Sequence, residues 1–162
     1  MPKKIFSVLS ILILCAVFCA CQKSGEIGLT MDELSTRFNE VAKNTEYRLG
    51  KSEKNTDNTY SIATKDETAR VICDIENDRI VEINVNGTGY YSPGLASFDY
   101  MEYVLMCVDK SFDETTAGDF IADLYYEASN GGDTVKTEYN GLQYEYKKVE
   151  NDYWLTVKNP QK

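Results

Sequence analysis

Two hydrophobic patterns alternate along the chain, and their order constrains the fold more than any other feature. Apolar residues recur at three- and four-residue steps in some segments and alternate with polar residues in others. The first pattern predicts helices and the second predicts strands with one buried face. Their order is helix, four strands, two helices, three strands. This order predicts an α+β domain, in which an antiparallel sheet of about six to seven strands carries about three helices on one face.

Three segments carry the signals of helix starts. A capping box beginning at Thr30 opens a helix over residues 30–44. The pair Ser92-Pro93 places an N-cap and a proline at the first helical position of the second helix, whose apolar positions continue to Phe112. The third helix is expected to begin near Thr116 and to stop at residues 130–132, Asn-Gly-Gly.

The first four strands are expected at residues 46–53, 58–65, 71–75 and 81–85. A turn at residues 76–78 joins the last two. Their apolar faces share a side if this turn has three residues and lie on opposite sides if it has two, and the sequence leaves both registers open.

The end of the chain has the clearest strand pattern. Asn140-Gly141 and Asn151-Asp152 mark tight turns between three strands. Two-residue loops would align Val135 with Tyr146 and Val157, and would place Trp154 on the face opposite Leu155. A short echo, Glu-Asn-Asp followed by a strand, occurs at residues 76–85 and 150–157. The domain could therefore consist of two degenerate α-β halves.

The N-terminus has the layout of a secretory signal. Lys3 and Lys4 precede an almost wholly apolar run from Ile5 to Ala20. This run is shorter than the roughly 20 residues that a membrane-spanning helix needs. A cleaved signal is therefore favoured over a transmembrane anchor.

Ala20 directly before Cys21, after the apolar run, resembles the lipobox of bacterial lipoproteins. The pattern differs from the usual one at Phe18, where the family prefers Leu, and at Cys19, where it prefers a small residue. The resemblance implies a diacylglycerol on Cys21 and cleavage just before it. It divides the chain into a signal peptide (1–20), a lipidated cysteine and tether (21–28) and one domain (29–162), held at the extracytoplasmic face of the cell membrane. The alternative is an ordinary signal that leaves Cys21 free.

Charge and composition limit the function classes. Removing residues 1–20 takes away two lysines and no acid, so the formal charge changes from −9 to −11. Such a charge argues against a nucleic acid partner and leaves basic peptides, cations or cell-wall components open. The chain has no histidine, which excludes histidine triads and histidine zinc sites. We expect no enzyme activity, metal or cofactor.

Two cysteines remain in the predicted domain, Cys73 and Cys107. Outside the cytoplasm they could form a disulfide. Each also lies among apolar neighbours, as buried free cysteines do. Both interpretations stay open, because sequence alone does not give connectivity.

Aromatic residues are the candidates for ligand or partner contact. Tyr90 and Tyr91 follow a glycine-rich segment before the second helix, and Trp154 is the single tryptophan. Asp119, Asp123 and Glu127 lie four residues apart on the third helix and are interpreted as a solvated face. The Asp74–Asp78 segment lacks the glycine and glutamate of a calcium loop and is interpreted as a hairpin turn.

These observations predict a lipid-anchored, non-enzymatic binding domain for a protein, peptide or small ligand. Two other classes are an enzyme that cleaves cell-wall glycans with two carboxylates, and a structural envelope component. A carboxylate enzyme needs two acids in one cleft, about 5 Å or about 6.5–9.5 Å apart.

Replacing Cys21 with serine tests the anchor. Each buried CH₂ of an acyl chain contributes about 0.8 kcal/mol to membrane binding, so Cys21→Ser should abolish membrane sedimentation. Incorporation of labelled palmitate in cells, followed by fractionation, measures this. The Cys19→Ser variant should keep both the label and the membrane association. Full labelling of the Cys21→Ser chain would contradict the assignment.

Overall fold

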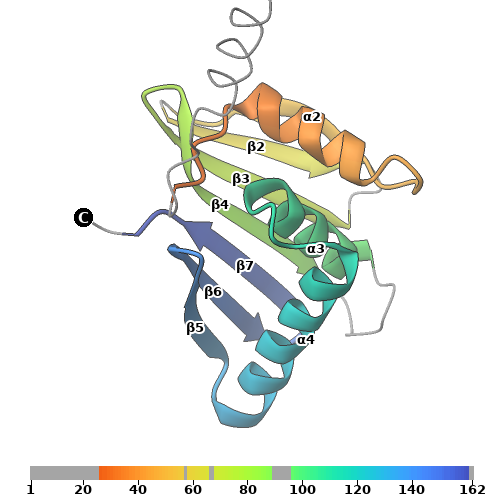
Figure 1. Ribbon diagram of the computed structural model, residues 1–162, viewed down its shortest axis with the longest axis vertical. Coiled ribbons are helices and arrows are strands. Elements are labelled where there is room, and N and C mark those ends of the chain that lie inside the picture. The colour runs from red at the N-terminus through yellow and green to blue at the C-terminus, as the bar shows by residue number, and fades with distance from the viewer. Residues whose placement is uncertain (1–25, 57, 66–67, 89–95, 161–162) are drawn as a thin grey trace, which may run out of the picture.

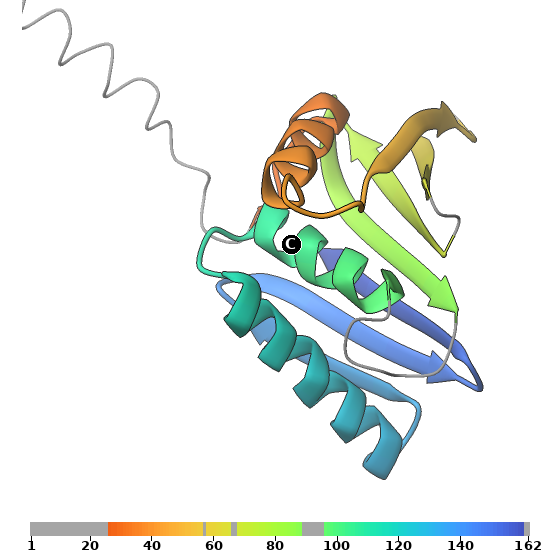
Figure 2. The ribbon, with the colours of Figure 1, turned by 90° about the vertical axis from the view of Figure 1, so that its right-hand side faces the viewer.

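A computed structural model describes residues 26–56, 58–65, 68–88 and 96–160. Seven antiparallel strands form one sheet in the order β1-β2-β3-β4-β7-β6-β5. The three helices lie together on one face of this sheet (Figures 1 and 2), which confirms the predicted α+β class. The elements are α2 (Met31–Val41), β1 (Leu49–Lys54), β2 (Thr59–Thr64), β3 (Ala69–Glu76), β4 (Arg79–Thr88), α3 (Ala96–Val108), α4 (Glu114–Gly131), β5 (Thr134–Tyr139), β6 (Leu142–Val149) and β7 (Asp152–Lys158).

The sheet consists of two meanders joined at its centre. Strands β1 to β4 pair in chain order, strands β5 to β7 pair in chain order, and the antiparallel β4–β7 ladder connects the two sets. The strands that follow the two echoed Glu-Asn-Asp segments are β4 and β7, so the two echoes meet at the junction. This arrangement agrees with two α-β halves, α2 with β1–β4 and α3–α4 with β5–β7.

Side chains cap the N-termini of α2 and α4. The Thr30 side chain accepts a hydrogen bond from the Glu33 amide at 3.1 Å, and the Glu33 carboxylate accepts one from the Thr30 amide at 2.8 Å. Helix α2 ends at Val41, three residues before the predicted end. Helix α4 begins at Glu114 with Asp113 as its N-cap. The predicted start near Thr116 is therefore wrong by two residues, because Thr116 closes the capping box of Asp113.

A bulge decides the register that the sequence left open. The β3–β4 turn has two residues, Asn77 and Asp78, both with positive φ (49° and 63°). A regular ladder would then place the apolar faces of β3 and β4 on opposite sides. The register shifts after Asp74, where Val81 is the extra residue, so Val71 still pairs with Val85. Both strands consequently turn their apolar side chains toward the helices.

The last turn lies one residue earlier than predicted. Glu150 and Asn151 form the loop, with Glu150 at φ 55°, and Val149 pairs with Asp152. Tyr146 therefore pairs with Leu155, so the predicted alignment of Tyr146 with Val157 is wrong. The shift is two residues in register, an even number, and every side chain keeps its predicted face.

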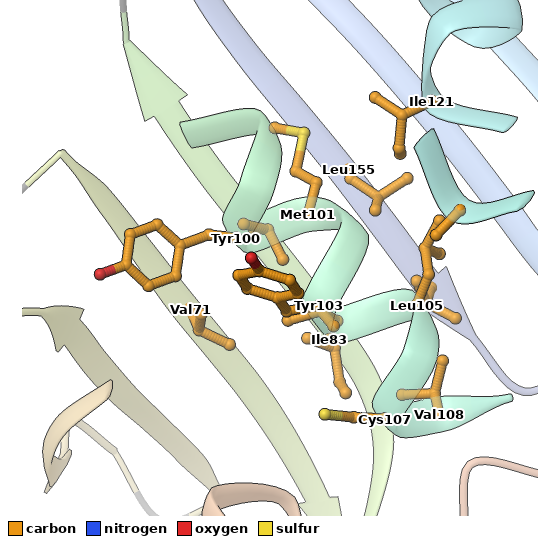
Figure 3. Packing of buried hydrophobic residues seen from close by; sticks show 14 of the residues in the cluster. Val71, Ile83, Tyr100, Met101, Tyr103, Leu105, Cys107, Val108, Ile121 and Leu155 are labelled. Atoms are coloured by element: carbon orange, nitrogen blue, oxygen red, sulfur yellow. The ribbon is translucent and has the colours of Figure 1, made fainter. Parts of the chain in front are cut away.

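The core lies between the helices and the sheet. Met101, Leu105 and Val108 of α3 lie over Ile83 and Leu155 of the central strands (Figure 3). Tyrosine is a core residue here: five of the ten described tyrosines are buried, and Tyr126 and Tyr139 are the exposed ones. Half of the described tyrosines therefore fill the core, where each large ring removes much apolar surface from water. The buried tyrosines are Tyr100, Tyr103, Tyr144, Tyr146 and Tyr153.

The folded domain begins before the predicted end of the tether. Ile27 is fully buried, and its amide donates a hydrogen bond of 2.7 Å to Asn159 Oδ1 near the C-terminus. The predicted tether to Gly28 is therefore too long by at least two residues, because an isolated apolar residue gave no periodic signal. Among the described helices, none combines the length and hydrophobicity needed to cross a membrane.

Substitution of Gly87 tests the contact between α3 and the sheet. A Cβ atom on Gly87 would lie 2.4 Å from Ser97 Cβ. Gly87→Ala should therefore destabilise the domain by about 1–3 kcal/mol, because Ser97 belongs to a packed helix. Urea unfolding measures the loss, and Ser97→Gly in the same chain should recover part of it. The control is Gly131→Ala, where no atom lies within 4 Å; similar midpoints for the two alanine variants would contradict this packing.

Candidate functional site

The sheet face opposite the helices is not covered by any element that the structure describes (Figure 2). Strand pairing arranges most of its side chains in three rows, and Val149 and Asp152 form a further pair beside them at the β6–β7 turn. The Trp154 row consists of Ala63, Arg70, Asn86, Trp154, Lys147 and Thr134; the central row consists of Glu53, Ser61, Ile72, Asn84, Thr156, Glu145 and Lys136; the Lys158 row consists of Thr59, Asp74, Glu82, Lys158, Gln143 and Glu138.

Trp154 lies on the open face in β7, one of the central strands of the sheet. It is partly exposed, and it lies opposite the buried Leu155 face, as the alternation predicted. Its neighbours across the ladder are Asn86 on β4 and Lys147 on β6. The Lys147 ammonium lies 5.9 Å from the indole centroid, within cation-π range. An aromatic side chain and a cation are thus presented together on an uncovered surface.

Hydrogen bonds fix the side chains of the central row. Thr156 Oγ1 donates to Asn84 Oδ1 at 2.6 Å, and Asn84 Nδ2 donates to Glu82 Oε1 at 2.9 Å. Lys136 and Glu145 form an ion pair at 3.0 Å. The open face therefore has a preorganised polar surface beside the indole, which lowers the entropy cost of binding.

Two depressions lie at the other end of the open face. One, of about 640 Å³, is bounded by the bulge at Val81, by the C-terminal Asn159 and Pro160 and by four carboxylates; the other, of about 500 Å³, crosses β5 and β6. Lys158 lines both. The four carboxylates of the larger depression belong to Glu26, Asp74, Glu76 and Glu82.

A second group of ionisable side chains lies between the helices. Burial raises the pKa of Glu102 on α3 to about 7, with the negative charges of Asp99 and Glu114 adding to the effect. Burial also raises the pKa of Asp99, while a hydrogen bond from Tyr47 opposes that shift. The Glu102 carboxylate lies against Gly118 of α4, where a Cβ atom would be 3.5 Å from Oε1.

The remaining residues singled out from the sequence can be compared with the structure one by one. Tyr90 and Tyr91 lie outside the described residues. Asp119, Asp123 and Glu127 are exposed, so the prediction of a solvated face is confirmed. The Asp74–Asp78 segment is the predicted hairpin end. Within the described ranges, no cluster of three or more His, Cys, Asp or Glu side chains could hold a metal ion.

The two domain cysteines are free thiols in this structure, so the disulfide considered from the sequence is not formed. Cys73 on β3 and Cys107 on α3 are both fully buried. Burial raises the pKa of each thiol to about 12. Neither thiol is a reactive nucleophile at neutral pH, because the thiolate is the reactive form.

Sequence reasoning missed Arg70, Lys147 and Glu102. The first two could have been found by alternation, since Arg70 is next to Val71 and Lys147 next to Tyr146 in predicted strands, which places them opposite the core. No local signal marks Glu102, because its burial depends on how α4 packs against α3.

Comparisons with known proteins add no relative: no protein-family model matches the chain, and neither the curated proteins nor the solved structures contain a significant match.

Replacement of Glu102 with glutamine tests its burial. The pKa of Glu102 is about 7 in the folded protein and 4.5 for the reference group. The folded state therefore holds the Glu102 proton up to a higher pH than the unfolded state does. The stability that this protonated side chain contributes is complete below about pH 4.5 and is lost as pH rises through about 7. Glu102→Gln removes that loss and should be more stable than the original chain by about 1–2 kcal/mol at pH 8, with a smaller gain at pH 5.

Urea unfolding at pH 5 and pH 8 gives both values. The matched control is Glu127→Gln, because Glu127 is exposed on α4. If both glutamine variants show the same pH dependence, Glu102 is not buried as described.

Proposed function

We propose that this protein is a lipid-anchored, non-enzymatic binding domain of the extracytoplasmic membrane face, and that the open sheet face is its binding surface. The observation that carries the proposal is the partly exposed Trp154 on that face, beside Lys147 and the hydrogen-bonded central row. Aromatic residues held on rigid strands are the usual anchors of binding surfaces. Tyrosines contribute less to this surface, since most described tyrosines face the core or the helices.

The proposed anchor would orient this surface. Four residues lie between Cys21 and Glu26, so five Cα-to-Cα steps give a reach of about 17 Å at most. Glu26 lies beside the end of the sheet where Glu82, Lys158 and Asn159 line the larger depression. Trp154 pairs with Asn86, four residues further along β4 than Glu82, or about 13 Å. A lipid on Cys21 would therefore hold the Lys158 row nearer to the membrane and present the Trp154 row away from it.

One observation favours a second candidate, the carboxylate-based glycan hydrolase. Glu102 has a pKa of about 7, as a general acid requires, and Asp99 lies three residues before it on α3. Burial raises the pKa of Asp99 as well, and a hydrogen bond from Tyr47 opposes that shift. These acids differ from the exposed row on α4. Clearing of a cell-wall suspension by the purified chain, and its loss in Glu102→Gln, would support the enzyme; no clearing would exclude it for that substrate.

Photo-crosslinking in intact cells tests the binding surface. A photoreactive phenylalanine analogue at position 154 should give a discrete adduct of higher mass, because this side chain lies on the proposed contact surface. The matched position is Tyr126, which is 56% exposed on α4 at the helical side of the domain. Adducts at position 126 but not at 154 would reject the open face as the binding surface.

A further inference from the structure

The Trp154 row differs in charge from the domain that carries it. Arg70 and Lys147 flank Asn86 and Trp154, and the Trp154 row itself holds no carboxylate. Asp152 lies on the same face two residues before the tryptophan. Arg70 forms no ion pair within the described ranges. Glu145 of the neighbouring row is already paired with Lys136 at 3.0 Å. The row therefore has a local excess of positive charge, on a domain whose formal charge after signal removal is −11.

The distance of each charge from Trp154 decides which charges act on a ligand bound there. At physiological ionic strength the Debye length is about 8 Å, so most of the distant acids are screened. Adjacent strands lie about 4.8 Å apart, which places Lys147 one strand from Trp154 and Arg70 two strands away. Asp152 lies about 7 Å from Trp154 along β7, so a ligand seated on the indole is influenced by this carboxylate and, with one positive charge in excess, by the two cations. An anionic group on the ligand complements them.

The surroundings of Trp154 are polar, which narrows the class of ligand. Its nearest cross-strand neighbour on β4 is Asn86, whose side-chain amide forms no hydrogen bond with any described residue. Besides the tryptophan, the apolar side chains on this face are Ile72 and Ala63 in the three rows and Val149, which pairs with Asp152 beside the Trp154 row. A protein hot spot or a lipid site would need a larger apolar surface around the ring. A sugar ring offers C–H groups to stack on the indole and hydroxyls to bond with amides.

We infer that the Trp154 row binds a glycan that carries carboxylate groups. One sugar ring stacks on the Trp154 indole, the Asn86 amide bonds its hydroxyls, and the carboxylate lies between Lys147 and Arg70. This inference rests on the proposed binding function of the open face and names its ligand class. Orientation away from the membrane would place the row toward the polymers of the cell envelope.

The single tryptophan makes the site observable, because all tryptophan fluorescence of the chain arises from Trp154. The full chain in a zwitterionic detergent is titrated with the disaccharide of N-acetylglucosamine and N-acetylmuramic acid, which carries one carboxylate. The comparison sugar is chitobiose, which has two N-acetylglucosamine units and no carboxylate. Saturable quenching is expected for both, with about three- to tenfold tighter binding of the acidic sugar. Calorimetry repeats each titration, because Lys147 itself contacts the indole.

Charge-matched variants separate the two cations from the general charge of the protein. Arg70→Gln with Lys147→Gln should remove the preference for the acidic sugar, so that the ratio of the two dissociation constants falls to about one. Lys43→Gln with Lys110→Gln changes the net charge by the same amount at exposed positions away from the row, and should leave the preference intact. Equal binding of the two sugars, or equal effects of the two double variants, would overturn the role of the carboxylate.

The experiments distinguish a wrong ligand class from a wrong binding surface. If neither sugar quenches Trp154 or releases heat, the glycan inference is rejected. A crosslinked adduct at position 154 would then leave the open face as a surface for a protein partner. Absence of both quenching and adduct would reject the ligand class and the binding surface together.

Discussion

The β4–β7 ladder is the interaction on which the rest of the structure depends. It joins the two meanders into one sheet, and it sets the register of both faces at once. On the helical side it pairs Val85 with Leu155 and Ile83 with Val157; on the open side it pairs Asn86 with Trp154 and Asn84 with Thr156. Side chains alternate across a strand, so a slip of one residue would bury the tryptophan side and expose the core side. The same ladder therefore specifies the core and the candidate site.

In the part of the chain that the structure describes, helices cover one face of the sheet and leave the other open. This explains why apolar and polar side chains are divided between the two faces. Three helices bury one face, and large tyrosines supply much of the core there, while the other face carries polar side chains held by hydrogen bonds and one ion pair. Antiparallel sheets tolerate this arrangement because their ladders satisfy the backbone on both faces. A surface of this kind is rigid without a second layer, which suits binding by preorganised side chains. It also leaves Trp154 accessible at no cost to the core.

Two half-buried carboxylates lie on the opposite side of the sheet from this surface. Asp99 and Glu102 occupy one side of α3, where burial raises both pKa values. Burying a carboxyl group away from a cation destabilises its charged form. These residues are therefore either a source of pH-dependent stability or the acids of the alternative enzyme, and the stability and cell-wall assays address the two roles separately.

Local chemistry along the chain was sufficient for the kinds of element, their order and the inward or outward face of most side chains. The capping box at Thr30, the alternation around Leu155 and the signal-like N-terminus are all local patterns, and the first two are confirmed. Only the tertiary structure decided that β4 pairs with β7, that a bulge at Val81 restores the common face of β3 and β4, and that Arg70, Trp154 and Lys147 share a row. The physical reason is that periodicity reports burial one segment at a time, whereas strand order, register and the burial of Glu102 depend on contacts between segments far apart in the sequence.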